Sequence, residues 1–576
     1  MLRLNSSRGS GTHRAAGSFR GVAGVCLAVG AVVASAGIGA TGAEGPYDLV
    51  LRGGRVVDGA GVAAYFADVA VREGRIAAIG RIPGRGREEI EIRGRVIAPG
   101  FVDVHTHAEN VLTLRRAENF VRMGVTTLVL GNCGGSTLDV GDFFRKLEAE
   151  PAAANVATLI GHNTVRREAM GGAFDRVPSP AEQERMETLV ARAMDDGAVG
   201  LSTGLIYLPG SFAQTEEIIR LAKIAAAKGG LYATHQRNEG TGIATSLDEV
   251  FRVAREAGIR AQVSHIKLSG KSAWGRADAI LATLDRARDE GLDITQDQYA
   301  YTASSTGLAQ LIPASAREGG AAAFRARLDD PARKREIVDR MKETLRARGQ
   351  ESYDYAVIAS YSRDPSLNGK SVVEAARLRR GADTLDDQIE LILEVELNGG
   401  ASAVFHGMSE EDIRAFMRHP NTMIASDSGV RAPDEGVPHP RGYGNNARVL
   451  GRYVRETKVL RLEEAVRRMT SLPATVFRLP ERGMLQPGFW ADIVVFDPST
   501  VRDTATYSEP HQFPVGIDLV LTNGVPVFRG GEHTDARPGR PVRLAAALAR
   551  TAAVRSLHRI VGVDAAPALL RARAHR

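Results

Sequence analysis

The chain has 576 residues, of which 44% are hydrophobic and 25% are charged, the composition of an ordinary globular protein. Its formal net charge of +6 is concentrated at the ends, because residues 1–45 carry +3 and residues 537–576 carry +8, whereas the body between them carries −5. A mildly acidic body lacks the basic footprint of nucleic-acid-binding proteins, so we expect no nucleic-acid partner. The length predicts one large domain with additions, or two to three domains.

The first 43 residues predict a signal peptide. A basic stretch is followed by an uncharged run from Gly21 to Ala43, which ends in small residues. This pattern is typical of a secretory signal cleaved near Ala43, so we expect export to the periplasm or the extracellular medium. An N-terminal membrane anchor is the alternative, because the run is long enough to span a bilayer. Its high glycine and alanine content favours cleavage, which would leave a mature chain with no stable membrane insertion and one cysteine, Cys133.

Short segments of alternating polar and apolar residues lie near both ends of the chain. Residues 44–97 contain YDLVLRGGRVVDGAG and DVAVREGRIAAIG, and residues 481–543 contain ADIVVFDP and LVLTNGVPVFRGG. Such segments are typical of strands joined at turns that contain glycine. We therefore predict a small β-sandwich-like domain built from both chain ends. Residues 544–576 predict a basic helical tail, which would pack on the body or face an anionic surface.

The segment between these ends, residues 98–480, alternates strands with helices. Eight apolar runs of strand length are separated by helical patterns such as residues 181–197 and 215–230. Repeated βα units predict parallel strands, and eight of them predict a (β/α)8 TIM-like barrel of the α/β class. One connection, residues 302–420, is too long for a single helix and predicts an inserted subdomain over the barrel mouth. The eight runs are FVDVHTH, TTLVLGN, VATLIGH, AVGLSTG, LYATHQR, AQVSHIK, DITQDQY and TMIASDS.

Most of these runs end in, or lead directly into, a residue that can bind a metal. The carboxyl ends of barrel strands carry the chemistry of this fold, and histidine, thiolate and carboxylate are ligands of zinc and related metals. Taken alone, the cysteine is more typical of a small buried hydrophobic residue. The strand-end set is His105, His107, Cys133, His162, His235, His265 and Asp427. His105 and His107 lie on one face of their strand, because side chains alternate along it, and the whole set predicts a metal site at the rim.

From about residue 46 to about residue 540 the chain resembles the N-acyl-D-amino-acid deacylases, or D-aminoacylases, of the amidohydrolase superfamily. The matching stretches are GFVDVHTHAEN, GNCGGS, GLIYLPGSFAQTEEI, HQRNEG, VSHIKLSG, DQYAYTASSTGL, ASDSGV, HPRGYGNNARVLGRYVRE and MTSLPATVFRLPERGMLQPGFWADIVVFDP. Two features depart from the family pattern. The usual short Ser-Asp-Gly turn reads SDSG here, and residues 544–576 extend beyond the pattern.

The resemblance implies one tightly bound zinc ion, held by Cys133, His235 and His265, with the cysteine in place of the carboxylated lysine of many amidohydrolases. A thiolate is a soft anionic ligand that suits zinc. His105 and His107 would form a second, weaker position to which the strand-end aspartate could contribute, and their alternative role is structural support of the rim. Zinc is satisfied by three protein ligands and water, so the sequence leaves open whether one metal binds or two.

The resemblance also implies roles in catalysis and substrate binding. Asp427 would take a proton from the attacking water and deliver it to the departing amine, which leaves poorly unless it is protonated. Arg441 would bind the substrate α-carboxylate through its guanidinium fork. Lys267 and Tyr299 match the remaining substrate anchors, and Tyr207 would line the pocket. The alternative for the two tyrosines is packing at the rim.

These residues imply zinc-dependent hydrolysis of the amide bond of small N-acyl-D-amino acids to a carboxylate and a free D-amino acid. A related amidohydrolase that acts on dipeptides, cyclic amides or other C–N bonds is the alternative enzyme. A metal- or ligand-binding protein without catalysis is the third interpretation, and the presence of Asp427 argues against it. The sequence does not specify the preferred side chain or acyl group, the number of metals or the oligomeric state.

Overall fold

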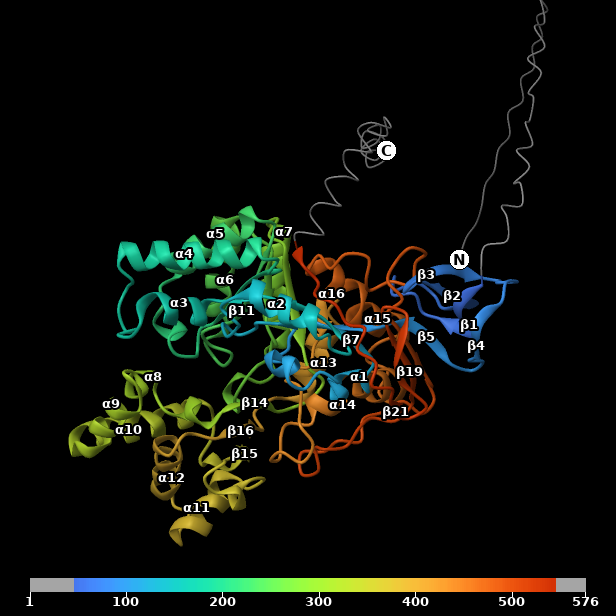
Figure 1. The fold of residues 1–576 in the computed structure, drawn as a ribbon. Coiled ribbons are helices and arrows are strands. Elements are labelled where there is room, and N and C mark those ends of the chain that lie inside the picture. Colours follow the sequence, from blue (N-terminus) through green and yellow to red (C-terminus); the bar gives the residue numbers. More distant parts are fainter. Residues whose placement is uncertain (1–45, 545–576) are drawn as a thin grey trace, which may run out of the picture. The chain divides into compact units, whose positions relative to one another are not determined.

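The computed structural model describes residues 46–544, and Figure 1 shows their arrangement. The predicted signal peptide and all but the first residue of the predicted basic tail lie outside the described residues. Within residues 46–544, no helix combines the length and the apolar character needed to cross a membrane.

Eight parallel strands form the predicted barrel, and each predicted run overlaps one of them. Their residues are all buried, as expected of parallel strands that are covered on both faces. The third strand is interrupted at Leu159, and backbone hydrogen bonds of 2.8 Å, from Asp427 to His105 and from His107 to Ser428, join the eighth strand to the first. The strands are β6 (Phe101–Asp103), β7 (Val125–Leu130), β8 (Asn155–Thr158) with β9 (Ile160–Gly161), β10 (Gly200–Gly204), β11 (Leu231–His235), β12 (Ala261–Val263), β13 (Ile294–Gln298) and β17 (Thr422–Ile424).

The helices of the barrel region begin and end at recognisable signals. The Ser179 and Glu182 side chains form a capping box at the start of α4 (Pro180–Asp195), and Gly258 adopts a left-handed conformation after α6 (Ile243–Ala257). The other helices are α1 (Glu118–Val121), α2 (Val140–Ala149), α3 (His162–Met170), α5 (Thr215–Ala227), α7 (Ala277–Asp289), α13 (Glu410–Arg418), α14 (Arg441–Arg448), α15 (Leu462–Met469) and α16 (Ser471–Val476).

Both ends of the described chain contribute to one nine-stranded sheet. Strand β5 (Val96–Pro99) pairs with β1 (Tyr47–Val56) from its own end and with β18 (Ile493–Phe496) from the other. Side chains alternate along β18, so that Ile493 and Val495 join the cluster of the sheet, whereas Val494 and Phe496 pack into the barrel core. The sheet is therefore fixed to the barrel. Its other strands are β2 (Tyr65–Arg72), β3 (Arg75–Gly80), β4 (Gly86–Glu91), β19 (Ile517–Thr522), β20 (Val525–Arg529) and β21 (Glu532–His533).

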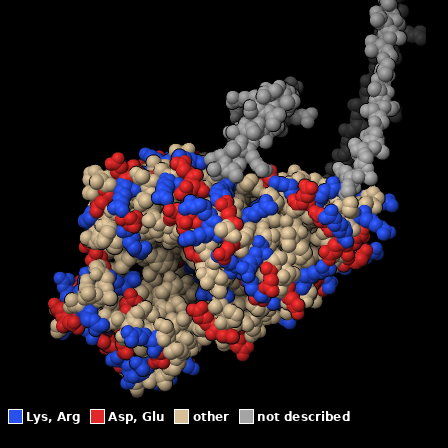
Figure 2. All heavy atoms as spheres, in the orientation of Figure 1, with Lys and Arg blue, Asp and Glu red and all other residues tan. Residues whose placement is uncertain are grey.

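The long connection after β13 folds as a subdomain with its own hydrophobic cluster (Figure 1, yellow-green). Helix α13 then packs on α7, β13 and β17, so the chain is back against the barrel before residue 420, the end that the sequence predicted for the insertion. Figure 2 shows a hollow between the insertion and helices α3 to α6, with mostly uncharged walls. The elements of the insertion are β14 (Ser304–Gly307), α8 (Ala314–Arg317), α9 (Gly320–Asp329), α10 (Pro331–Ala347), β15 (Ala356–Ser360), α11 (Val372–Arg380), α12 (Leu385–Leu397) and β16 (Ser402–Phe405).

Candidate active site and metal centre

Three predicted zinc ligands converge at the carboxyl ends of three barrel strands. Cys133 follows β7, His235 ends β11 and His265 follows β12. The Cys133 Sγ lies 3.7 Å from His235 Nδ1 and 3.5 Å from His265 Nε2, and the two nitrogens are 2.9 Å apart. All three side chains are buried. One sulfur and two imidazole nitrogens facing a common point form a donor set that fits zinc, which takes such ligands with water as the fourth.

Three residues of the cluster have a strained backbone conformation of a kind that is common at functional sites. Cys133, His265 and Asp427 have positive φ values of 53°, 37° and 53°, which side chains other than glycine rarely adopt. Such conformations cost about 1–3 kcal/mol each and persist where the surrounding structure imposes them. Gly134 follows the cysteine because a Cβ there would lie 2.4 Å from the Asn163 side-chain oxygen. The GNCGG motif thus serves to turn the thiol into the barrel mouth.

The second predicted metal position adjoins the first. His105 Nε2 lies 3.3 Å from Cys133 Sγ and 3.5 Å from Asp427 Oδ1, and His107 Nε2 lies 3.2 Å from the same carboxylate oxygen. The ligand atoms of His105, His107 and Cys133 all lie within 4.8 Å of one another, as do those of His105, His265 and Asp427. Cys133 belongs both to the triad with His235 and His265 and to the group with His105 and His107, so its thiol lies between the two predicted metal positions.

Charged neighbours decide the protonation of the two acidic ligands. Burial raises the pKa of the Cys133 thiol, but the His105 and His265 imidazoles outweigh burial and hold this pKa well below the usual value. Burial likewise raises the pKa of Asp427, and Arg441 and His105 lower it well below the usual carboxyl range. The site therefore holds a thiolate and a carboxylate at neutral pH, the anionic forms that bind metals.

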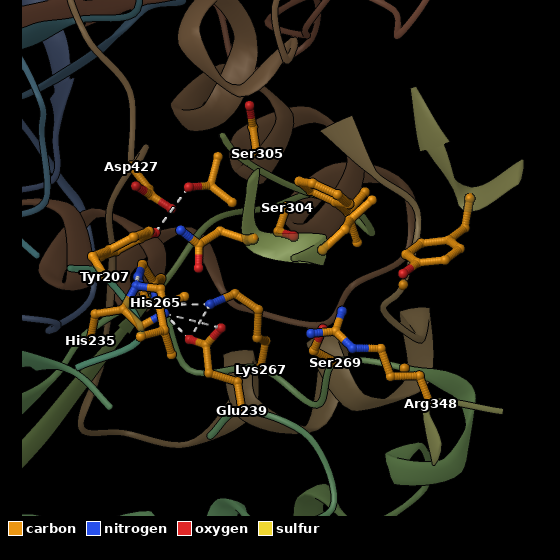
Figure 3. A pocket seen from close by; sticks show the side chains of 18 of the residues that line it. Tyr207, His235, Glu239, His265, Lys267, Ser269, Ser304, Ser305, Arg348 and Asp427 are labelled. Atoms are coloured by element: carbon orange, nitrogen blue, oxygen red, sulfur yellow. Dashed lines mark hydrogen bonds and ion pairs between the residues drawn. The ribbon is translucent and has the colours of Figure 1, made fainter. Parts of the chain in front are cut away.

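Glu239 is a site residue that sequence reasoning missed. Its Oε1 lies 3.0 Å from His265 Nδ1, and its Oε2 lies 3.5 Å from His235 Nε2. These are the ring nitrogens that face away from Cys133, so one carboxylate supports both histidines from behind (Figure 3). Lys267 Nζ lies 2.5 Å from Glu239 Oε1 and 2.8 Å from His265 Nδ1. The only available signal was the position of Glu239 within HQRNEG, four residues after a ligand.

Two further buried carboxylates hold the first strand in place. Asp297, at the end of β13, lies 3.4 Å from His105 Nδ1 and accepts a 2.9 Å hydrogen bond from the His265 backbone. Asp103, two residues before His105, accepts hydrogen bonds from the His105 and Ser426 backbones, and burial raises its pKa to about 6. For Asp103 the sequence signal was an acidic residue at the end of an apolar run, whereas Asp297 lies in a polar segment, ITQDQ, that gives no such signal.

The predicted substrate residues surround this cluster. Arg441, the first residue of α14, places Nη1 2.8 Å from Asp427 Oδ2, and its guanidinium lies 4.6 Å from the Tyr299 ring centroid. The Tyr299 hydroxyl donates to Met408 Sδ at 3.5 Å. Tyr207 lies edge-on to a zinc-ligand imidazole and accepts a 3.1 Å hydrogen bond from Thr306 of the insertion. Three of the four predicted residues thus contact the ligand cluster directly, and Tyr299 contacts it through Arg441.

His162 is the strand-end residue that does not join the cluster. It begins α3, and its Nε2 lies 2.7 Å from Glu217 of α5, whose other oxygen pairs with Arg166. These three side chains form a buried polar group between helices. The residue that ends the third run therefore stabilises packing, whereas the other six strand-end residues meet at the rim.

A cavity connects the cluster with the insertion. The barrel lines it with residues that include His235, His265, Lys267 and Asp427, and the insertion with Ser304, Thr306, Leu311, Arg348, Tyr355 and Phe405. A second cavity is lined by His107, Cys133, Asn163 and Arg167. Tyr207, Ser305, Thr306 and Asp427 line both cavities, so the Tyr207–Thr306 hydrogen bond lies where the two cavities meet.

Comparison with known proteins matches this architecture. Residues 88–528 fit the model of the amidohydrolase family. The chain is 37% identical over 526 residues to N-acyl-D-glutamate deacylase of Alcaligenes xylosoxydans xylosoxydans, covering 87% of this chain and 98% of that protein. It is 36% identical to D-aminoacylase of the same organism, covering 88% of this chain and 99% of that protein. The chain therefore belongs to the amidohydrolase family, on the branch that contains these two enzymes.

Solved structures of related enzymes support the same family assignment. A crystal structure of N-acyl-D-glutamate deacylase from Bordetella bronchiseptica, complexed with zinc and a phosphonate mimic of the tetrahedral intermediate, matches with a TM-score of 0.74 at 37% identity, over 86% of this chain and 100% of that one. A D-aminoacylase structure with a binuclear metal centre matches with a TM-score of 0.75 at 34% identity, over the same shares. The predicted family and fold class are thus confirmed.

Proposed function

We propose that this protein is a zinc-dependent hydrolase that cleaves the amide bond of N-acyl-D-amino acids to give a carboxylate and a free D-amino acid. The convergence of Cys133, His235 and His265 beside the ionised Asp427, within one cavity region, carries this proposal. It is supported by full-length similarity to N-acyl-D-glutamate deacylase and D-aminoacylase. The residues supply metal ligands and a proton carrier, which amide hydrolysis requires.

Cys133, His235 and His265 would hold the tight zinc ion, because they form a buried three-ligand set. His105, His107 and Asp427 would supply a second, weaker position. In the related D-aminoacylase, study of the binuclear centre describes activation by one metal and attenuation by the second. Zinc bound in such a site activates water and polarises the scissile carbonyl.

Asp427 performs the proton transfers in the proposed reaction. Its carboxylate is ionised at neutral pH and accepts a proton from the water that attacks the carbonyl carbon. The same carboxyl group then gives that proton to the amide nitrogen as the C–N bond breaks, so the amine leaves neutral. A carboxyl group with a depressed pKa gives its proton up readily, which suits the second step.

Arg441, Lys267, Tyr299 and Tyr207 would position the substrate. The buried Arg441 Nε has no hydrogen-bond partner among residues 46–544, so it can bind the α-carboxylate while Nη1 stays paired with Asp427. The Tyr299 face orients the guanidinium. Fixing the α-carboxylate, the carbonyl and the side chain at three points would select the D enantiomer.

The direct test is hydrolysis of matched N-acetyl-D- and N-acetyl-L-amino acids by the purified protein, with zinc analysis of the same sample. We expect turnover of D substrates, weak turnover of L substrates and about one tightly held zinc ion per chain. An active enzyme that cleaves cyclic amides or α-carboxamide substrates as well as free N-acyl-D-amino acids would instead be a broader amidase.

We further propose that the chain is exported after cleavage near Ala43. The support is the uncharged run from Gly21, which follows a basic stretch and ends in small residues. N-terminal sequencing of protein recovered outside the cytoplasm should find a start near Glu44. Recovery of an intact N-terminus in the membrane fraction would favour the anchor instead.

A further inference from the structure

We propose that Arg348 makes this enzyme selective for substrates that carry a second carboxylate, in addition to the α-carboxylate of the amino acid. This inference rests on the proposed function and specifies its substrate class. Arg348 follows α10 in the insertion and lines the cavity that also contains the metal-ligand histidines and Lys267. Figure 3 shows Lys267 between those histidines and Arg348.

The backbone holds Arg348 in place on both sides. Its N–H donates to the carbonyls of Thr344 and Leu345 at 3.2 Å, and its own carbonyl accepts from Ser272 of the barrel at 3.4 Å. Arg348 therefore lies at the junction between the insertion and the barrel. Its backbone is held by these hydrogen bonds, and its side chain lines the cavity.

The charges of the cavity are balanced everywhere except at Arg348. Two carboxylates line it, and each already has a cation, since Glu239 pairs with Lys267 and Asp427 pairs with Arg441. Within residues 46–544, no carboxylate forms an ion pair with Arg348. Its side chain is half-buried and hydrogen-bonds the Tyr355 hydroxyl, which is neutral at pH 7 and whose pKa burial raises further. A partly desolvated guanidinium without a counter-charge favours an anionic ligand group.

The walls near Arg348 suit a short chain that ends in a charge. Leu311 and Phe405 offer apolar contact for methylene groups, whereas Gln310, Gln350 and Ser269 offer hydrogen bonds around a polar end. The matching chemical group is an aliphatic carboxylate. It could be the side chain of an acidic D-amino acid, such as D-glutamate, or the distal end of a dicarboxylic acyl group, such as succinyl.

Two isosteric substrate pairs test the inference and identify the source of the carboxylate. The first pair is N-acetyl-D-glutamate and N-acetyl-D-glutamine, and the second is N-succinyl-D-methionine and its succinamyl counterpart. We expect kcat/KM to be about 10- to 100-fold higher for the charged member of one pair, the range for one charge-assisted hydrogen bond. Equal kcat/KM values within both pairs would overturn the inference without touching the proposed function. Absence of turnover for every member, in protein that holds zinc, would overturn the proposed function itself.

Variants then assign the preference to this residue. Arg348→Met should remove it by lowering kcat/KM for the charged substrate and leaving the neutral one within about 3-fold, and Arg348→Lys should keep part of it. Arg346→Met is the matched control, because Arg346 lies exposed on the last turn of α10 and does not line the cavity. A preference that survives in Arg348→Met, or that disappears equally in the control, would contradict the assignment.

Discussion

Arg441 Nη1 lies 2.8 Å from Asp427 Oδ2, and both side chains are buried. Burial alone would raise the pKa of the carboxyl group, and Arg441 is the strongest of the neighbours that lower it. The same guanidinium stacks on Tyr299 at the substrate wall. One arginine therefore contacts both the proton carrier and the wall that would hold the substrate. A substitution of Arg441 should therefore change both the pKa of Asp427 and substrate binding.

Two substitutions of Arg441 distinguish the effect of its positive charge from the effect of its planar, two-pronged shape. Arg441→Met removes the cation that lowers the pKa of Asp427, so this pKa rises and the acid limb of the kcat/KM profile moves to higher pH. Arg441→Lys keeps the charge but loses the fork, so its acid limb should stay near that of the wild type while kcat/KM falls about 10- to 150-fold. The comparison to make is the pH profile of each variant, beside the ratio of D to L turnover. Identical profiles in all three proteins would place the proton carrier elsewhere.

Asp427→Asn should retain zinc and fold but lose turnover. An amide cannot carry the proton from water to the leaving amine, so kcat should fall about 10²- to 10⁴-fold. Zinc content and the thermal unfolding midpoint, measured on the same sample, distinguish this loss from a loss of structure. Near-normal kcat in the variant would assign the acid–base role to another group.

Cys133→Ala should release the tight zinc ion. The variant removes the thiolate that stands between both ligand groups and leaves imidazoles without an anionic sulfur. Zinc per chain after dialysis should fall well below one, and activity should fall with it. Full metal content and activity would make Cys133 a packing residue, the role that a lone buried cysteine has most often.

Glu239→Gln should weaken zinc binding without changing the ligands. The carboxylate lies behind His235 and His265, and loss of such support typically lowers metal affinity or activity 10- to 100-fold. Competition with a chelator measures the zinc affinity directly. Ser269→Ala is a suitable control, because Ser269 lines the same cavity and the backbone hydrogen bond from its N–H to the Glu239 carbonyl is kept in the variant. Unchanged zinc affinity in Glu239→Gln would show that the carboxylate serves Lys267 alone.

Glu217→Gln tests the buried polar group around His162. Burial raises the pKa of Glu217, but the hydrogen bond from His162 and the charge of Arg166 outweigh it, so this pKa is lower in the folded state. A lowered folded-state pKa adds stability above the unfolded value, about 4.3, and this contribution is lost as pH falls through the folded pKa. At pH 7 the variant should be less stable by about 3–5 kcal/mol, because Arg166 loses its buried counter-charge. Urea unfolding should show this difference narrowing below about pH 4. A constant difference across that range would contradict the prediction.

The strands of the barrel were predictable because their sequences carry two signals at once. Most of the runs are apolar, as burial on both faces favours, and most end in a polar residue that can bind a metal. The runs overestimated strand length, since β6 ends at Asp103 and β17 at Ile424. The chain leaves regular pairing there in order to turn His105 and Asp427 into the mouth. The strand propensity of the sequence does not predict where regular strand pairing ends.

The residues that support the ligands were less predictable, because their role depends on the direction in which each side chain points. Glu239 lies in a loop, and its spacing from His235 does not reveal that it turns back beneath two imidazoles. His162 shows the converse, since a strand-end histidine faces outward once α3 begins at that residue. Arg441 was expected to meet a substrate carboxylate, and in the structure it pairs with Asp427. Such pairings join distant parts of the chain, and local patterns do not encode them.

The hydrogen bonds between the segments that follow β17 and β6 have a consequence for how the metal centre forms. Asp427 and His105 are joined through their own backbones, so the last strand and the second metal position are completed in one event. The three ligands of the tight triad all precede the insertion in the chain, and so does Asp297, which accepts a hydrogen bond from the His265 backbone. Zinc could therefore bind its three tight ligands in a growing chain, whereas the second, weaker position would be complete only when the ring of strands is closed. Zinc retained by ribosome-bound chains stalled before and after residue 427 would report that order.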